Sequence, residues 1–240
     1  MLIWEGRSKH TQQGARGVIQ ACLTGYAPGA LSQNRKTGPM VQLWIIPRDV
    51  APSDSVKTGA DASGCALCSR RPSLAAASGL APCYEVLVHG PNSVWKSHRG
   101  HVADLQRARD AQPIMRAFGL RFGAWGDPAM LPDSVNRFLL DLSGGRHTGY
   151  THDWKYKRSQ WLRAHLMASV DTSEEMNHAH ALGWRTFRPR PVGDTVGATE
   201  RQCPAAKGIE AMQCWQCLAC DGARADKTGH DRRNISTEEH

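Results

Sequence analysis

The 240-residue sequence has no long hydrophobic run. Its longest apolar stretches, such as residues 41–46 with Gln42 among them, fall far short of the roughly 20 residues that cross a bilayer. The N-terminus, MLIWEGRSKHTQQ, also lacks a basic segment followed by the about 7–15 apolar residues of a secretory signal. We therefore expect a cytoplasmic protein with no membrane partner.

The common catalytic and nucleotide-binding motifs are missing as well. The chain has no G-x-x-x-x-G-K-[ST], no G-x-G-x-x-G after a strand, no H-E-x-x-H and no G-x-S-x-G. Their absence excludes the simplest nucleotide-binding, metalloprotease and hydrolase interpretations. Hydrophobic residues at 40% and charged residues at 22% are typical of a folded globular chain, which excludes a fully disordered, collagen-like or coiled-coil protein.

Positive charge is in excess, because 30 Lys and Arg stand against 22 Asp and Glu and give a formal charge of +8. This balance favours anionic partners such as a nucleic acid or a nucleotide. One stretch, WKYKRSQWLRAH, interleaves aromatic and basic side chains and is a candidate nucleic-acid-binding segment, with Lys155, Lys157, Arg158, Trp161 and Arg163 as contacts. A solvated basic helix with buried aromatic residues explains the same pattern equally well.

The eight cysteines carry the strongest signal. In a reducing compartment, clustered cysteines favour metal ligands over disulfides. Cys214, Cys217 and Cys220 form a C-x2-C-x2-C run, and Cys203, followed by a proline, precedes it. This pattern predicts a [4Fe-4S] cluster, although in the ferredoxin run the remote cysteine follows the triplet. Four thiolates also form structural zinc sites, so zinc is the competing interpretation.

A second group, formed by Cys65, Cys68 and Cys83, is one ligand short of a closed site. Three thiolates would leave one iron of a cluster open to a substrate or cofactor, or a water position on zinc, so the site is potentially reactive. A fourth ligand remains an alternative, with Cys22, His89 and His98 as candidates.

Hydrophobic periodicity predicts an α/β fold, with parallel strands and covering helices in an open sheet or a partial barrel and with cysteine-rich metal-binding segments attached. We expect a loosely ordered N-terminal arm (1–38), a strand with the first cysteine group (39–100), an α/β core (101–195), a C-terminal cysteine segment (196–222) and a disordered tail (223–240). Within these segments we expect a strand at 40–46, a loop at 52–64, a strand at 84–88, strands ending at Asp127 and Asp171, a basic helix at 157–165, and a helix capped by Thr172 and Glu175.

Polar residues recur where the predicted strands of the core end. Asp127, His152 and Asp171 occupy such positions, and ligands of parallel sheets gather at the carboxyl ends of strands. We predict these three as catalytic residues. For Asp127 and Asp171 the alternative is a structural role, in capping a turn and a helix.

Several sequence blocks resemble an uncharacterised cysteine-rich family of bacteriophages and related mobile elements. They are RKTGPMVQLWII, GADASGCALC with a later CYE, RFGAWGDP, HTGYTHDW, LMASVDTSEEMNHAHALGWRTFR and the closing CP with CWQCLACDG. The resemblance covers about residues 36–222 and implies a phage or prophage context and a metal site. It implies no reaction.

A more distant architectural likeness is to radical S-adenosylmethionine enzymes, which combine a partial barrel with a three-cysteine [4Fe-4S] cluster. That superfamily uses C-x3-C-x2-C in a single loop, and Cys65, Cys68 and Cys83 depart from this spacing. The likeness adds S-adenosylmethionine as a candidate cofactor beside the iron-sulfur cluster or zinc. The leading hypothesis is thus a metal-binding protein with redox or radical chemistry on a nucleotide or nucleic acid. The alternative is a zinc-stabilised, non-catalytic protein that binds nucleic acid or a host protein.

Overall fold

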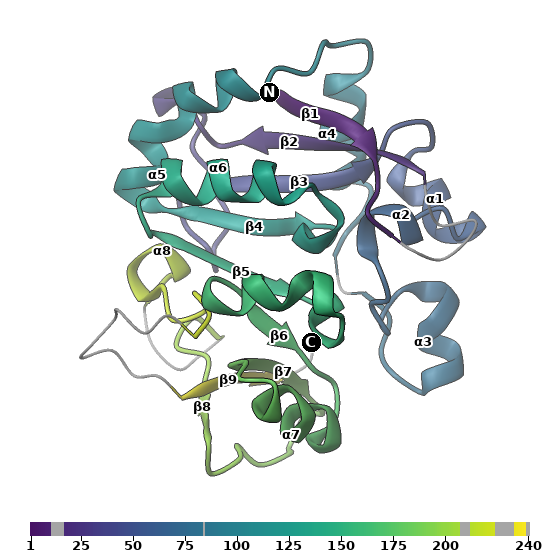
Figure 1. Cartoon of the computed structure of the whole chain (residues 1–240), viewed down its shortest axis with the longest axis vertical. Helices are drawn as coiled ribbons and strands as arrows, with labels where there is room; N and C mark the ends of the chain where they lie inside the picture. Colours follow the sequence, from purple (N-terminus) through teal and green to yellow (C-terminus); the bar gives the residue numbers. More distant parts are fainter. Residues whose placement is uncertain (11–16, 84, 207–211, 224–232, 239–240) are drawn as a thin grey trace.

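The computed structural model describes residues 1–10, 17–83, 85–206, 212–223 and 233–238. Within these residues nine strands form a single sheet in the order β1-β2-β3-β4-β5-β6-β7-β9-β8 (Figure 1). The strands are β1 (Leu2–Arg7), β2 (Val18–Thr24), β3 (Val41–Pro47), β4 (Leu120–Trp125), β5 (His147–Thr151), β6 (Met167–Ser169), β7 (Thr186–Arg190), β8 (Glu200–Gln202) and β9 (Asn234–Glu238). β1, β2 and β3 pair antiparallel, and every pair from β3 onward is parallel, which confirms the α/β class.

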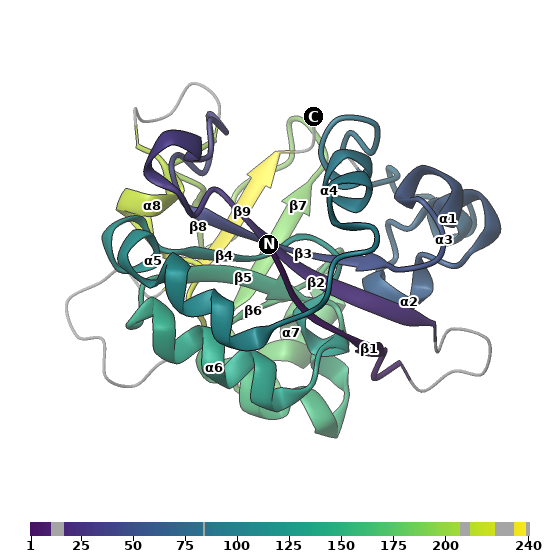
Figure 2. The same ribbon diagram turned by 90° about the horizontal axis from the view of Figure 1, so that it is seen from above.

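Helices cover both faces of the sheet. Figure 2 shows α6 (Asp133–Ser143) and α7 (Ser173–Ala181) on one side and α4 (Pro91–His98) and α8 (Cys214–Cys217) on the other. α5 (Gln112–Phe118) packs beside α6. The remaining helices are α1 (Pro52–Thr58), α2 (Ala62–Cys65) and α3 (Pro72–Ser78), and the 3-10 turns are η1 (Pro28–Ala30), η2 (Leu105–Ala111), η3 (Pro128–Met130), η4 (Asp153–Lys155) and η5 (Lys157–Ala164). None of the helices in the described ranges is long and apolar enough to span a membrane.

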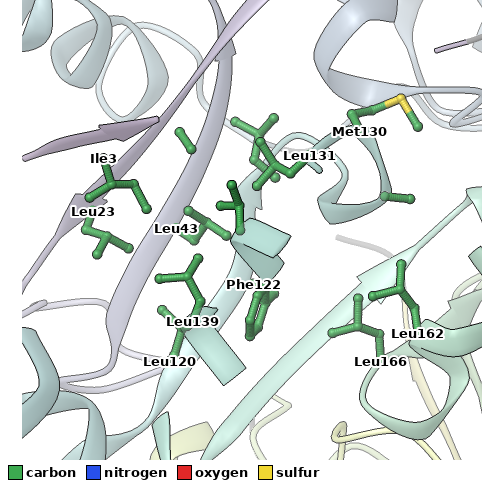
Figure 3. Close-up of a cluster of buried hydrophobic side chains, with 14 of the residues drawn as sticks. Ile3, Leu23, Leu43, Leu120, Phe122, Met130, Leu131, Leu139, Leu162 and Leu166 are labelled. Carbon is green, nitrogen blue, oxygen red and sulfur yellow. The ribbon is translucent and has the colours of Figure 1, made fainter. Parts of the chain in front are cut away.

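The main core lies between the sheet and the α5–α7 side. Side chains alternate along β4, so Leu120 and Phe122 enter this core while Arg121 points to the opposite face. Figure 3 shows Leu120 and Phe122 beside Leu139 of α6 and Leu43 of β3, all buried. Each such side chain contributes about 2 kcal/mol on burial, so this layer holds the sheet firmly. Two smaller apolar clusters, one around Ile46 and Trp125 and one around Met167 and Phe187, lie outside this main core.

The chain termini differ from the sequence prediction. Residues 1–10 and 17–38 are not a loose arm, because β1 and β2 extend the sheet and bury Leu2, Ile3, Ile19 and Leu23. At the other end, β9 inserts between β7 and β8 within the tail predicted as disordered, of which residues 224–232 and 239–240 lie outside the described ranges. Residues 2–7 and 234–238 therefore belong to the sheet.

Local predictions had mixed outcomes. The strands at 40–46, before Asp127 and before Asp171 are confirmed as β3, β4 and β6, and Thr172 caps α7 by accepting the Glu175 N–H at 3.2 Å. The loop expected at 52–64 is wrong. Two helices form there: α1 begins at Pro52, and α2 follows its N-cap residue Asp61. The strand expected at 84–88 is wrong for residues 85–88, and the basic helix at 157–165 is the 3-10 turn η5.

The end of β4 requires a glycine. Gly126 has φ +87°, and a Cβ there would lie 2.2 Å from the backbone oxygen of Ile45. We predict that Gly126→Ala lowers the free energy of unfolding by about 3 kcal/mol, because left-handed strain adds to a clash with backbone that cannot move aside. Denaturant titration measures this value.

Gly59→Ala is the matched control. Gly59 has a similar φ of +79°, but a Cβ there meets nothing within 4 Å. This variant should lose only about 1 kcal/mol from left-handed strain. Equal losses in the two variants would show that the contact between β4 and β3 is not as tight as described.

Candidate metal centres and the cavity between them

The first cysteine group lies in the segment that follows β3, the first strand of the parallel part of the sheet. Cys65 ends α2, and the Cys68 N–H donates to the Cys65 carbonyl at 3.2 Å. Cys83 returns to the same place because its N–H donates to the Arg70 carbonyl at 2.7 Å. The backbone therefore brings the three predicted ligands together although fourteen residues separate the last two.

Buried carboxylates at strand ends hold this cysteine loop on the sheet. Asp171, after β6, accepts from the Ser69 hydroxyl and pairs with Arg70 at 2.9 Å. The Arg70 and Asp171 side chains are only 9% and 6% exposed, so solvent screens the pair weakly. A second buried pair, between Arg71 and Asp61 at 2.8 Å, fixes the loop from its other side. Both residues after Ser69 are thus anchored by ion pairs.

Asp127, at the end of β4, completes the anchoring through its backbone and side chain. Its N–H donates to the Gly64 carbonyl at 2.7 Å, next to Cys65. Its carboxylate accepts from the Ala129 N–H at 2.9 Å, as the cap of η3, and from the His152 N–H at 2.7 Å. Burial raises the pKa of Asp127 despite these bonds. The capping role considered for Asp127 is present, whereas Asp171 positions the cysteine loop and leaves the helix cap to Thr172.

His152 is the strand-end residue whose side chain is uncommitted. Its Nε2 atom is buried and has no hydrogen-bond partner among the described residues, and its ring lines a cavity together with Cys65, Cys68 and Cys83. Burial lowers the pKa of His152, so the neutral ring is favoured there. Asp127 and Asp171 use their carboxylates to hold the structure together. His152 is therefore the predicted catalytic residue whose side chain has an atom without a hydrogen-bond partner, Nε2, among the described residues.

The second cysteine group assembles from three contacts distant in sequence. The Cys203 N–H donates to Ser236 at 2.8 Å, the Cys214 N–H donates to Lys36 at 2.9 Å, and the Cys220 carbonyl accepts from Gly149 at 3.0 Å. Burial raises the pKa of Cys220, and the charges of Cys203, Cys214 and Cys217 raise it further. These four thiols therefore lie within electrostatic range of one another and Tyr150 lies beside Cys220, but the described side chains are not arranged around one ion position.

Two adjoining cavities lie between the two cysteine groups, on the face of the sheet that carries Arg121, and form two lobes. One lobe, of about 130 Å³, is lined by Cys65, Cys68 and Cys83, and the adjoining lobe, of about 160 Å³, is lined by Cys214. The lobes share six lining residues: Arg70, Glu85, Arg121, Tyr150, Phe187 and Pro189. In Figures 1 and 2, α8 and the α1–α3 segment lie at opposite ends of the strands. The cavity therefore runs along the sheet from one cysteine group to the other.

The donor sets suit thiophilic metals. Burial raises the pKa of Cys68 to about 12 and that of Cys83 to about 11, so these thiols are protonated unless a metal replaces the proton. In the described ranges no three Cys, His, Asp or Glu side chains are already arranged around one ion. The candidate fourth ligands Cys22, His89 and His98 do not line the cavity, since Cys22 is in the core and His98 Nδ1 lies 2.8 Å from the Val94 carbonyl oxygen.

The predicted nucleic-acid-binding segment lies away from this cavity, on the η4 and η5 turns. Most of its side chains have partners within the protein: Lys155 pairs with Glu175 at 2.6 Å, Arg158 pairs with Asp153, and Arg163 donates to the Leu182 carbonyl at 3.3 Å. Trp161 packs against the core under the Arg137 guanidinium at 4.1 Å, while Lys157 is exposed. Nucleic-acid binding by this segment stays a prediction without structural support.

Sequence reasoning missed the side chains that line the cavity between the cysteine groups. Arg121 lies between the buried Leu120 and Phe122 in the strand LRFGAW. Because side chains alternate along a strand, this pattern predicts that Arg121 lies on the face opposite these two residues. Lys36 and Tyr150 gave no such signal, because their place depends on contacts with the distant Cys214 and Cys220.

The Asp171 contact to Arg70 gives a direct test of the cysteine loop. Asp171→Asn should lower the free energy of unfolding by about 3 kcal/mol, because it leaves the Arg70 charge buried without its partner. Asp54→Asn removes an ion pair with Lys57 whose side chains are 59% and 72% exposed, and it should leave stability unchanged within error. Equal stability of the two variants would contradict the anchoring role of Asp171.

Comparison with known proteins returns no match to a family model, to a curated protein or to a solved structure. The resemblance to a phage protein family stays a prediction. What the chain does has to be inferred from the chemistry of the two cysteine groups and of the cavity that joins them.

Proposed function

We propose that this chain is an iron-sulfur enzyme whose reactive centre is a [4Fe-4S] cluster on Cys65, Cys68 and Cys83. The observation that supports it is that three thiols of one anchored loop line a cavity at the carboxyl edge of a parallel sheet. Substrates of parallel α/β sheets bind at this edge. The second group, Cys203, Cys214, Cys217 and Cys220, is proposed to hold a further, fully ligated cluster.

The number of ligands favours a reactive centre over a structural one. A cluster with three protein thiolates keeps one iron for an external ligand, and the cavity is where such a ligand would meet it. His152 and Arg121 line the same cavity and are placed to contact a bound molecule. The chain itself supplies the anchoring carboxylates, the unpartnered His152 nitrogen and a partly enclosed space.

The proposed chemistry is redox or radical chemistry on a nucleotide or a related anion. A cluster held by Cys65, Cys68 and Cys83 would supply the reductive cleavage of S-adenosylmethionine, the candidate cofactor. With one electron from an external reductant and a hydrogen atom from the substrate, the products would be methionine and 5′-deoxyadenosine. Formation of 5′-deoxyadenosine from S-adenosylmethionine and dithionite is the activity readout.

The first experiment is anaerobic reconstitution with iron and sulfide. We expect a brown protein that absorbs broadly near about 400 nm and holds about eight iron atoms, four for each cluster. Cys65→Ala/Cys68→Ala and Cys214→Ala/Cys217→Ala should each halve the iron content, since each removes one ligand set. Only the first double variant should abolish the formation of 5′-deoxyadenosine.

Cys22→Ala is the matched control, because Cys22 is fully buried in the core beside Leu2 and Ile46. It should keep the full iron content. Stoichiometric zinc in a colourless protein would refute the proposal and leave a zinc-stabilised binding protein as the interpretation. Iron retained in full by either double variant would refute the assignment of its ligands.

A further inference from the structure

Three cationic side chains line the lobe of the cavity that reaches Cys214, and two of them have no ion-pair partner among the described residues. Arg121 of β4 and Lys36, just before β3, line this lobe of about 160 Å³. Neither side chain forms a hydrogen bond or ion pair within the described part of the chain. Both residues line the same lobe as Cys214.

The other charged groups of this lobe do not neutralise the two cations. Arg70 is paired with Asp171, and Glu238 lies 3.8 Å from Arg190. Glu85 is the remaining carboxylate. Burial raises the pKa of Glu85 and the Arg121 charge lowers it, so the two groups interact although no ion pair joins them in the described ranges. Two cations therefore face one carboxylate, and the lobe keeps a net positive charge.

The surroundings are suited to an anion. Arg121 and Lys36 are both half-buried, so their charges are less screened than on an open surface. A guanidinium offers a planar set of donors that matches the oxygens of a phosphate, and an ammonium adds a second point charge. Thr148 lines the same lobe, and its hydroxyl is able to donate a further hydrogen bond.

We propose that Arg121 and Lys36 form a phosphate-binding subsite, and that the enzyme acts on a phosphorylated small molecule such as a nucleotide. This inference rests on the proposed function for its reaction, because it names the substrate class of the same cavity. A phosphate held at Arg121 and Lys36 would leave the rest of the molecule to extend along Tyr150 and Phe187 toward Cys65, Cys68 and Cys83.

The test is calorimetric titration of the full chain, with and without reconstituted clusters, using inorganic phosphate, adenosine monophosphate and acetate as probes. We expect both phosphates to bind, acetate to bind at least tenfold more weakly, and Arg121→Gln and Lys36→Gln each to weaken phosphate binding at least tenfold. The charge-matched controls Arg7→Gln and Lys96→Gln, at exposed positions outside the cavity, should bind like the wild type.

Iron content of each sample separates this inference from the proposed function. Loss of phosphate binding in Arg121→Gln with full iron supports the subsite. No phosphate binding by the wild type, equal binding by Arg121→Gln, or equal affinity for acetate would overturn it, whether or not the clusters form. A further contrary outcome is that the wild type binds no phosphate while Lys36→Gln and Arg121→Gln lose iron. The two cations would then serve only to neutralise the negative charge of the cysteine thiolates.

Discussion

The candidate site depends on the attachment of one long loop to the carboxyl edge of the sheet. Buried Asp171 pairs with Arg70, and Asp127 bonds both to the backbone beside Cys65 and to the turn that carries His152. Charges removed from water are costly unless they are paired, so these contacts hold strongly only while both partners are in place. They fix Cys65, Cys68 and Cys83 relative to β4, β5 and β6, and so define the cavity that those residues line.

The division of the sheet into two faces explains how the protein combines stability with reactive groups. The α5–α7 side buries a continuous apolar layer, whereas the opposite face carries both cysteine groups, His152, Arg121 and Tyr150. Alternation along each strand places these two sets of residues only one position apart. We therefore expect substitutions of cavity-lining side chains to leave the packing of the main core unchanged, so that the site can be tested by mutation.

Much of the fold was predictable from the sequence, and the residues that escaped prediction share a physical reason. β3, β4 and β6 are short apolar runs that end at Pro47, Asp127 and Asp171, and local pattern was enough to predict them. β1 and β9 are held by pairing with β2 and β7, and their polar surroundings concealed them. The ligand residues were predicted from spacing, but the proximity of Lys36 to Cys214 arises from a tertiary contact that spacing does not encode.

The central claim is that a cluster on Cys65, Cys68 and Cys83 presents one iron to the cavity. Mössbauer spectroscopy of the Cys214→Ala/Cys217→Ala variant reconstituted with ⁵⁷Fe tests it most directly, because only the first cluster should then contribute. We expect a [4Fe-4S] spectrum in which the signal of one iron of four differs from the other three and shifts when S-adenosylmethionine is added. A spectrum without a [4Fe-4S] signal, or one in which no iron responds to an added ligand, would contradict the account.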